Sequence, residues 1–321
     1  MRSTILVAGS LNLDFVAGVC RLPEPGQTVT GTSFEMIPGG KGANQACAAG
    51  TMARRKAPAE PGDAVRVEMA GCVGRDEAGE MLLRSLAGAG VAAEAVGRVD
   101  GVATGAAMIN VDASGQNTIV VIPGANARFA PSDVDSLRGR LRECAWLLLQ
   151  LETPLGTVEA LLRAARQEGA RTMLDPAPAQ PLARGLLSMV DILTPNETEA
   201  CLLLERAPRR VGLEDAPDLA RSLRALGPRA VVLKLGDAGC FYSGPEGEQS
   251  APAFAVRAVD ATAAGDTFNA GLAVALSEGL PVAGALRFAN ASAAVSVTRK
   301  GAQTSAPERD DVERLLSTGR I

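Results

Sequence analysis

Short apolar runs alternate along this chain with longer segments in which apolar residues recur every three or four positions. The runs at residues 5–9, 67–72, 146–149, 172–174, 192–193 and 230–235 have the length and composition of buried strands. Helical patterns separate them at 42–53, 77–89, 155–168, 197–205 and 215–226, and further helices are expected at 266–279, 282–298 and 308–317. This alternation predicts βαβ units, and therefore an α/β fold with a mostly parallel sheet covered by helices on both faces.

Two regions depart from the alternation. Residues 14–37 and 92–122 contain β-rich runs without intervening helices, so we expect them to form a small separate sheet. Residues 53–64 are polar and contain proline, which indicates an inserted surface loop.

Composition places the chain among ordinary globular proteins. Its 321 residues, 47% hydrophobic and 21% charged, are enough for one large α/β domain or two smaller ones. The formal net charge of −4 argues against a nucleic-acid partner, because nucleic-acid binders usually carry a basic stripe.

Several features predict a cytoplasmic protein with no membrane segment. Every apolar run is shorter than a membrane span, and the first residues enter a strand too early for a signal peptide. The six cysteines are scattered without a C-x-x-C pair and lie mostly in apolar runs, so we expect buried free thiols.

The chain contains no histidine, which narrows the chemistry it can perform. A Ser-His-Asp or Cys-His triad, a histidine-bearing zinc site and an imidazole base are all excluded. Acid–base chemistry must therefore use a carboxylate, lysine, tyrosine or cysteine.

The stretch GSLNLD (9–14) follows the first predicted strand. In an extended segment Asn12 and Asp14 project to the same side, and ligands of open α/β sheets bind beyond the carboxyl ends of strands. An amide beside a carboxylate suits a polyhydroxylated ligand. The alternative is an ordinary turn at the end of a strand.

The stretch PGGKGANQA (38–46) matches neither a phosphate-binding P-loop nor a dinucleotide fingerprint. Two adjacent glycines lead into a helix on which Lys41 and Asn44, three residues apart, face the same way. A glycine-rich helix start is the simpler interpretation, but the polar residues favour ligand contact or a hinge.

In TPNETEA (194–200), Asn196 and Glu199 share the first turn of a predicted helix. A carboxylate and an amide there can hold phosphate through hydrated Mg²⁺. An acidic first turn that complements the helix dipole explains the same residues equally well.

The stretch VDATAAGDTFNAG (259–271) places three small residues before Asp266 at the start of a long helix. Small side chains let an anion approach the backbone amides at a helix N-terminus. Asp266 is either a helix cap or a base that takes a proton from a hydroxyl attacking a bound phosphate. Repulsion between a capping carboxylate and such an anion favours the second role.

These stretches, with LQLETP and VTRKGAQTS, occur in the order and spacing of a known family. Over about residues 4–317 the chain resembles the ribokinase group of the PfkB-type carbohydrate kinases. The resemblance implies a single doubly wound, ribokinase-like α/β kinase domain over 1–321, with a β-sheet lid from about 14–37 and 92–122. The lid would close over the sugar and pair with a second subunit's lid in a homodimer.

The resemblance also implies transfer of phosphate from ATP to the O5 hydroxyl of D-ribose. Asp266 falls on the catalytic base, and Ala263, Ala264 and Gly265 fall on an anion hole whose amides stabilise the transferring γ-phosphate. The family's sugar contacts fall on Asn12, Asp14, Gly40, Lys41, Gly42, Ala43, Asn44, Glu152 and Asp266.

Nucleotide and cation sites are implied in the same way. The ATP positions are Asn196, Lys234, Leu235, Gly236, Asp237, Ala238, Gly239, Gly265, Asp266 and Asn290. Glu199 would act through Mg²⁺. A K⁺-type site would use the side chains of Asp260 and Ser305 and the carbonyls of Thr262, Ser296, Arg299 and Gly301.

Three features differ from the usual family pattern. The 53–64 insertion is long, Lys234 replaces a frequent threonine, and Asn290 replaces a frequent histidine.

Other functions are compatible with these residues. A related kinase of 2-deoxyribose, fructose or a nucleoside would use the same motifs, and a non-catalytic sugar-binding regulator is a further alternative. A nicotinamide dehydrogenase is disfavoured, because no G-x-G-x-x-G follows the first strand.

Overall fold

The computed structural model describes residues 2–54 and 65–320. A large sheet of nine strands has the order β13-β12-β11-β10-β9-β8-β1-β4-β5. Neighbours from β5 to β11 are parallel, whereas β12 and β13 continue the sheet antiparallel at one edge. The strands are β1 (Thr4–Ala8), β4 (Arg66–Gly74), β5 (Ala92–Val99), β8 (Cys144–Leu149), β9 (Arg171–Leu174), β10 (Ile192–Leu193), β11 (Ala230–Lys234), β12 (Cys240–Gly244) and β13 (Gly247–Ala251).

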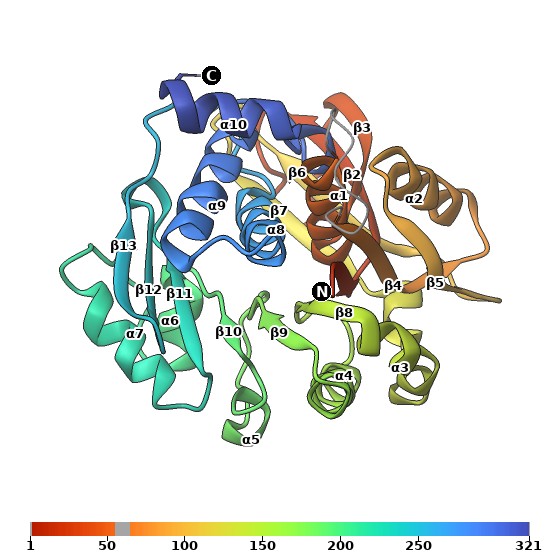
Figure 1. Ribbon diagram of the computed structural model, residues 1–321. Coiled ribbons are helices and arrows are strands. Elements are labelled where there is room, and N and C mark those ends of the chain that lie inside the picture. The colour runs from red at the N-terminus through yellow and green to blue at the C-terminus, as the bar shows by residue number, and fades with distance from the viewer. Residues whose placement is uncertain (1, 55–64, 321) are drawn as a thin grey trace.

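Helices cover both faces of this sheet, which confirms the predicted α/β class (Figure 1). One face packs against α1 (Lys41–Ala53), α2 (Glu77–Gly88), α8 (Ala264–Ser277), α9 (Val282–Ser296) and α10 (Arg309–Thr318). The other packs against α3 (Val134–Glu143), α4 (Leu155–Glu168), α5 (Arg184–Leu187), α6 (Glu197–Leu203) and α7 (Ala216–Arg224).

The two hydrophobic cores follow from the alternation of side chains along each strand. In β1, Ile5 and Val7 belong to the first core, while Leu6 and Ala8 belong to the second. Because neighbouring side chains point to opposite faces and both faces are covered, the strand is apolar throughout.

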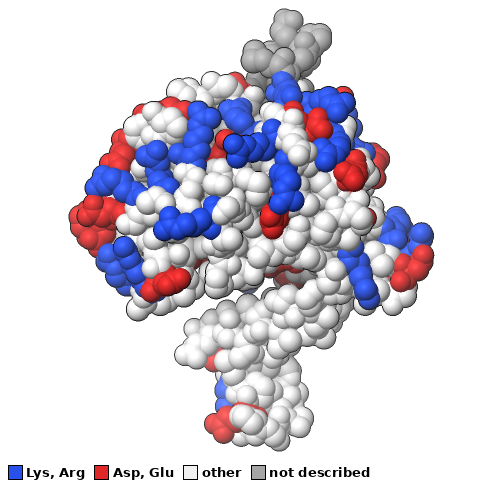
Figure 2. Space-filling view, turned by 90° about the horizontal axis from the view of Figure 1, so that it is seen from below, with Lys and Arg blue, Asp and Glu red and all other residues white. Residues whose placement is uncertain are grey.

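A second sheet has the order β3-β2-β6-β7 and consists of β2 (Asn12–Val19), β3 (Gly31–Gly39), β6 (Gly105–Val111) and β7 (Asn117–Ile122). Apolar side chains are exposed on it, among them Phe34 and Val120, which are 64% and 61% exposed. The lobe that projects from the body in Figure 2 carries few charged side chains.

The expectation that this sheet includes residues 92–99 was wrong. The strand β5 pairs in parallel with β4 in the large sheet. The reason is the helix α2 between them, since a strand–helix–strand unit returns the chain parallel to its first strand. The separate sheet therefore takes its second part from residues 105–122.

Other elements were not predicted. The helix α3 is mostly polar, with buried Val134, Leu137 and Leu141 on one side, and the edge strand β13 has the polar sequence GEQSA. Short turns form 3₁₀ helices at Gly124–Arg128, Pro131–Asp133, Gly236–Ala238 and Gln303–Ser305. Of the loop expected at 53–64, residues 55–64 lie outside the described residues.

All six cysteines are free, as predicted, and five of them are buried while Cys20 is exposed. In the described parts of the chain, no helix is both long enough and apolar enough to cross a bilayer.

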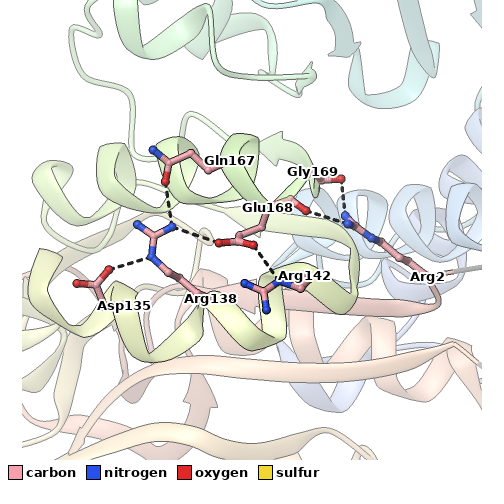
Figure 3. A network of polar contacts seen from close by, with 7 residues as sticks. All are labelled: Arg2, Asp135, Arg138, Arg142, Gln167, Glu168 and Gly169. Atoms are coloured by element: carbon pink, nitrogen blue, oxygen red, sulfur yellow. Dashed lines mark hydrogen bonds and ion pairs between the residues drawn. The ribbon is translucent and has the colours of Figure 1, made fainter.

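Polar contacts join α3, α4 and the N-terminus (Figure 3). The Glu168 carboxylate pairs with Arg138 at 3.3 Å and with Arg142 at 3.1 Å. Arg2 donates to the carbonyls of Glu168 and Gly169 at 2.8 and 2.5 Å, where a cation complements the negative end of α4. These contacts join α3 to α4, and α4 to Arg2 ahead of β1, on the face of the sheet away from α1 and α8.

Leu148→Ala should destabilise the fold by about 2–5 kcal/mol, because it leaves a cavity beside β8 where Leu148 is fully buried. Urea unfolding followed by circular dichroism measures the change. Leu202→Ala, at an exposed position of α6, should shift the free energy of unfolding by about 0.5 kcal/mol or less. Equal stability of the two variants would contradict the placement of Leu148.

Candidate active site

A cavity of about 410 Å³ opens where strands of the large sheet end and α1 and α8 begin. Its lining includes Lys41 of α1, Asp175 after β9, Glu199 of α6, Lys234 of β11 and Asp266 of α8. The carboxyl ends of parallel strands are where open α/β sheets bind ligands. The structure thus brings together four residues from separate predicted segments, along with Asp175, which was not predicted.

Asp266 lies in the first turn of α8, but it does not cap the helix. The N-cap is Ala263, and the Asp266 carboxylate accepts hydrogen bonds from Asn44 Nδ2 at 3.0 Å and Gln45 Nε2 at 3.1 Å. The capping interpretation of Asp266 is therefore wrong, because its oxygens are directed to side chains of α1. The residue is 6% exposed.

Burial raises the pKa of Asp266 to about 6, with Asp175 acting in the same direction and Lys41 and the two amides opposing it. A carboxylate of this pKa is largely ionised near neutral pH yet remains a stronger base than an exposed aspartate. Such a pKa is suited to general-base catalysis.

The start of α8 presents backbone amides beside this carboxylate. Ala263 has a left-handed φ of 57°, which costs an alanine about 1–2 kcal/mol, and no side chain caps the helix. The Ala264 amide donates to the Ala261 carbonyl at 3.2 Å. Gly265 follows without a side chain, so an anion can approach the amides of the first turn closely.

On the other side of Asp266 lie the residues predicted to hold a sugar. Asn12 is buried, and its Oδ1 accepts a hydrogen bond from Asn126 Nδ2 at 2.7 Å. Burial, followed by the nearby charge of Glu152, raises the pKa of Asp14 to about 7. Asn44 Oδ1 is buried with no hydrogen-bond partner in the described structure. A hydroxyl-rich ligand would supply the missing donor.

The glycines before α1 permit its close approach to the strand ends. A Cβ on Gly40, whose φ is 86°, would stand 2.7 Å from the Asn12 nitrogen, and one on Gly42 would stand 2.6 Å from the Ser10 nitrogen. The Ala43 amide donates to the Ser10 carbonyl at 2.9 Å. The glycines of the GGKG stretch are therefore required by packing as well as by any ligand.

Lys41 and Glu152 connect the sugar side to the cavity. Glu152 Oε2 accepts hydrogen bonds from the Lys41 amide at 3.0 Å and from Ser10 Oγ at 2.5 Å. Burial opposes the charge of the Lys41 side chain, but surrounding carboxylates, led by Asp266 and Asp175, raise its pKa. Lys41 therefore remains protonated.

Asn196 and Glu199 form a reciprocal capping box on α6, with hydrogen bonds of 2.7 and 2.8 Å. The first turn of α6 is acidic, as the structural interpretation expected, but the capping box was not predicted. Glu199 also lines the cavity, where burial raises its pKa against the opposing charge of Lys234. The same side chain is thus available to a cation in the cavity.

The run after β11 turns sharply beside the cavity. The Leu235 amide donates to the Gly239 carbonyl at 2.9 Å, and Gly236 lines the cavity. Asp237 points to solvent and pairs with Arg210 at 2.5 Å. Ala238 is the last residue of the 3₁₀ turn that begins at Gly236.

Asn290 is buried away from the cavity lining. Its Nδ2 donates to the carbonyls of Ala251 at 2.9 Å and Pro252 at 3.2 Å. Asn290 therefore anchors the end of β13 against α9.

Hydrogen bonds join three of the predicted cation residues, Asp260, Thr262 and Gly301. Asp260 accepts hydrogen bonds from the amides of Thr262 and Gly301, each at 2.9 Å. Although partial burial opposes the effect, these bonds lower the pKa of Asp260. Ser305 is fully buried and donates to the Ala302 carbonyl at 2.8 Å.

Near these residues, the Ser296 carbonyl accepts from the Arg299 amide at 3.0 Å, and the Arg299 side chain pairs with Asp311. Residues 2–54 and 65–320 contain no cluster of three or more histidine, cysteine, aspartate or glutamate residues able to hold a metal. One carboxylate, a hydroxyl and carbonyls fit a monovalent cation such as K⁺.

Four buried polar residues of the site were missed at the level of sequence. Gln150 donates to Gln45 Oε1 at 2.7 Å, and Gln45 donates to Asp175 Oδ2 at 3.1 Å as well as to Asp266. Asn126 Oδ1 accepts from the Leu11 amide at 2.9 Å. Gln150 and Asp175 each follow a predicted strand directly, the same signal that singled out Asn12.

Comparisons with known proteins agree with this geometry. The model of the pfkB family carbohydrate kinases matches residues 2–309. A ribokinase of Haemophilus influenzae is 38% identical, covering 98% of this chain and 99% of the relative. A deoxyribokinase of Salmonella typhi is 32% identical, covering 98% of each. The solved structure of an Arabidopsis thaliana ribokinase complexed with ribose and ATP has a TM-score of 0.88 at 32% identity, covering 98% of this chain and 99% of that one.

Asp266→Asn should change the pH dependence of stability. The pKa of Asp266 is raised from 3.8 to about 6 in the folded protein, so the stability it contributes is present below about pH 4 and lost as pH rises through 6. The variant should therefore gain stability relative to the parent between pH 4 and 6, by roughly 3 kcal/mol at most, and keep a constant difference above pH 7. Urea unfolding across this range measures it.

Asp112→Asn is a control for which the change of stability with pH should have the opposite direction. A hydrogen bond from Ser114 lowers the pKa of the exposed Asp112, so its contribution is present at neutral pH and lost on acidification. A pH-independent difference between the parent and Asp266→Asn would show that Asp266 does not titrate as described.

Proposed function

The chain belongs to the pfkB family of carbohydrate kinases, and on this basis we propose that it is an ATP-dependent ribokinase. It transfers the γ-phosphoryl group of ATP to the O5 hydroxyl of D-ribose, giving D-ribose 5-phosphate and ADP. The observation that carries the proposal is a buried carboxylate of raised pKa at the mouth of a helix whose first-turn amides face the same cavity.

Asp266 is the base in this proposal. Asn44 and Gln45 hold its carboxylate in place, and a pKa near 6 lets it accept a proton as O5 attacks the phosphorus. The oxygen then bonds to phosphorus while the bond to the β-phosphate oxygen breaks, and ADP leaves with that electron pair.

The amides at Ala263, Ala264 and Gly265 form the anion hole for the transferring group. Donors already aimed at the position where charge develops stabilise the transition state without reorganising. The Ala264 amide already donates to the Ala261 carbonyl, whereas Gly265 has no side chain of its own beside its amide. Both observations favour Gly265 as the main donor of the three.

The sugar is bound between the start of β2 and the start of α1. Asn12, Asp14 and Asn44 supply side-chain donors and acceptors, and Glu152 supplies a further carboxylate. Lys41, Gly42 and Ala43 belong to the same segment, which Gly40 allows to approach the start of β2 closely. A preference for 2-deoxyribose is the closest alternative, since the deoxyribokinase relative shares the whole chain length.

ATP occupies the other side of Asp266, along Asn196, Lys234 and the Leu235-to-Gly239 turn. Asp237 takes part through its backbone, since its side chain is in solvent. Asn290 acts on the adenine site indirectly, because it anchors the end of β13 that borders the adenine.

Metal ions complete the site. Bound Mg²⁺ would neutralise phosphate charge, and Glu199 in the cavity is the carboxylate that would hold it, with water and phosphate oxygens as the remaining ligands. K⁺ would lie among Asp260, Thr262, Ser296, Arg299, Gly301 and Ser305. Through Asp260 it would fix the loop that precedes the anion hole.

The small sheet acts as a lid in the same domain and as the interface of a homodimer. Its exposed Phe34, Met36, Met108 and Val120 lie on one face of the sheet, as the strand register shows, and form an apolar surface of the kind that a second copy covers. Free cysteines and the use of ATP support a cytoplasmic location.

Coupled ADP release with a panel of sugars tests the activity. We expect D-ribose to give a higher kcat/KM than 2-deoxyribose, fructose or adenosine, and K⁺ to raise the rate. Asp266→Asn should lower kcat by about 100- to 10,000-fold while ribose binding, measured by calorimetry, is retained. Asp135→Asn, exposed on α3, is the matched control and should leave kcat unchanged.

A stronger preference for another substrate would refute the ribose assignment. Near-parental kcat in Asp266→Asn would remove Asp266 from the role of base.

Val120→Asp should convert the dimer to a monomer, because a desolvated charge at the centre of an apolar interface is costly. Light scattering after size exclusion measures the mass. Leu202→Asp, also exposed but on α6, should leave the dimer intact. A parent protein that is monomeric at micromolar concentration would contradict the proposed interface.

A further inference from the structure

Lys234 forms an ion pair inside the cavity. Its Nζ lies 2.9 Å from Asp175 Oδ1, and the two side chains are 12% and 4% exposed. Asp175 Oδ2 is held on its other side by Gln45, which also binds Asp266. Gln45 therefore links the ion pair of Lys234 and Asp175 to Asp266 by hydrogen bonds.

The Lys234 ammonium also lies over the start of α8. A Cβ placed on Gly265 would stand 3.4 Å from Lys234 Nζ. The cation therefore borders the same cavity wall as the first-turn amides. A group bound at those amides meets a formal positive charge as well as backbone dipoles.

We propose that Lys234 is a catalytic residue that binds the phosphoryl group during its transfer. Asp175 holds the Lys234 side chain in place when the site is empty. The inference rests on the proposed kinase function and assigns Lys234 to the transferring group rather than to the nucleotide as a whole. Lys234 Nζ donates a hydrogen bond to an equatorial oxygen of that group.

The charges in the cavity explain why the lysine needs a partner. Asp175, Glu197, Glu199 and Asp266 are acidic, and Lys41 and Lys234 are basic. A long side chain is flexible, and the ion pair with Asp175 removes that freedom before substrate binds. Charge that develops on the phosphoryl oxygens then strengthens an interaction already in position, which is the condition for lowering the barrier.

A purely structural role for the pair is the competing explanation. Removing one member of a buried ion pair leaves the other charge without compensation, so Lys234→Met alone can destabilise the fold. The double variant Asp175→Asn/Lys234→Met removes both charges and keeps an amide for Gln45. This variant separates catalysis from folding.

The first measurement compares kcat, KM and melting temperature. We expect Lys234→Met to lower kcat by about 10- to 1000-fold with little change in KM for ribose, and Lys234→Arg to retain more activity than Lys234→Met. The double variant should recover the melting temperature of the parent but not its kcat. Recovery of kcat together with stability would overturn the proposal, because the lysine would then only neutralise Asp175.

The second measurement uses a mimic of the transferring group. Binding of ADP alone and of ADP with aluminium fluoride, each with Mg²⁺ and ribose, is measured by calorimetry for the parent and the double variant. We expect the double variant to lose affinity for the fluoride complex by about the same factor as kcat, with ADP alone little changed. Equal losses in both titrations would place the ammonium on the ADP phosphates and overturn the assignment.

Failure of this inference is distinct from failure of the proposed function. A parent enzyme without sugar-dependent ADP release would refute the kinase assignment. If the parent is active and its kcat is kept both in Lys234→Met and in the double variant, only the role of Lys234 is refuted.

Discussion

The Asp266 carboxylate is buried where α8 begins, and a buried charge is costly unless hydrogen bonds replace the water it has lost. Asn44 and Gln45 provide those bonds from α1, more than two hundred residues earlier in the chain. α1 must therefore pack against α8, and the glycines at 40 and 42 let it approach the strand ends. The position of the base, the closeness of the two helices and the glycine-rich entry to α1 are consequences of one constraint.

The same constraint accounts for the chemistry. Burial disfavours the charged form of Asp266, and the same effect raises its pKa. The free-energy cost of burying this carboxylate is therefore also what makes it a stronger base. Two lysines keep the acidic cavity from becoming too negative for a polyphosphate. In the proposed function, the site excludes water and attracts a metal–nucleotide complex, and positioning and electrostatics provide most of the rate enhancement.

Much of this was predictable from the sequence, for physical reasons. Strands buried on both faces are mainly apolar, so β1, β4, β8 and β11 were found. The edge strand β13 is polar and α3 has few buried positions, so neither carried a strong signal. Residues 92–99 were assigned to the wrong sheet because β-propensity does not reveal a strand's partner.

The site shows the same division between local and long-range information. Asp266, Asn12 and Asp14 lie in short motifs whose neighbouring residues also point to a ligand site. Their place in that site could therefore be inferred from the sequence. That Asp266 is bound by α1 rather than by its own helix depends on packing between distant segments. The ion pair of Asp175 with Lys234 joins the ends of two strands, and no periodicity along the chain relates them.

The central claim is that phosphate reaches the O5 oxygen of ribose at this site. Incubation of the protein with ATP, Mg²⁺ and ribose labelled with ¹³C at carbon 5, followed by ³¹P NMR, tests it directly. The account predicts a phosphomonoester signal coupled to the labelled carbon, formed together with ADP. A phosphate ester at another carbon, or release of inorganic phosphate without a sugar ester, would contradict it.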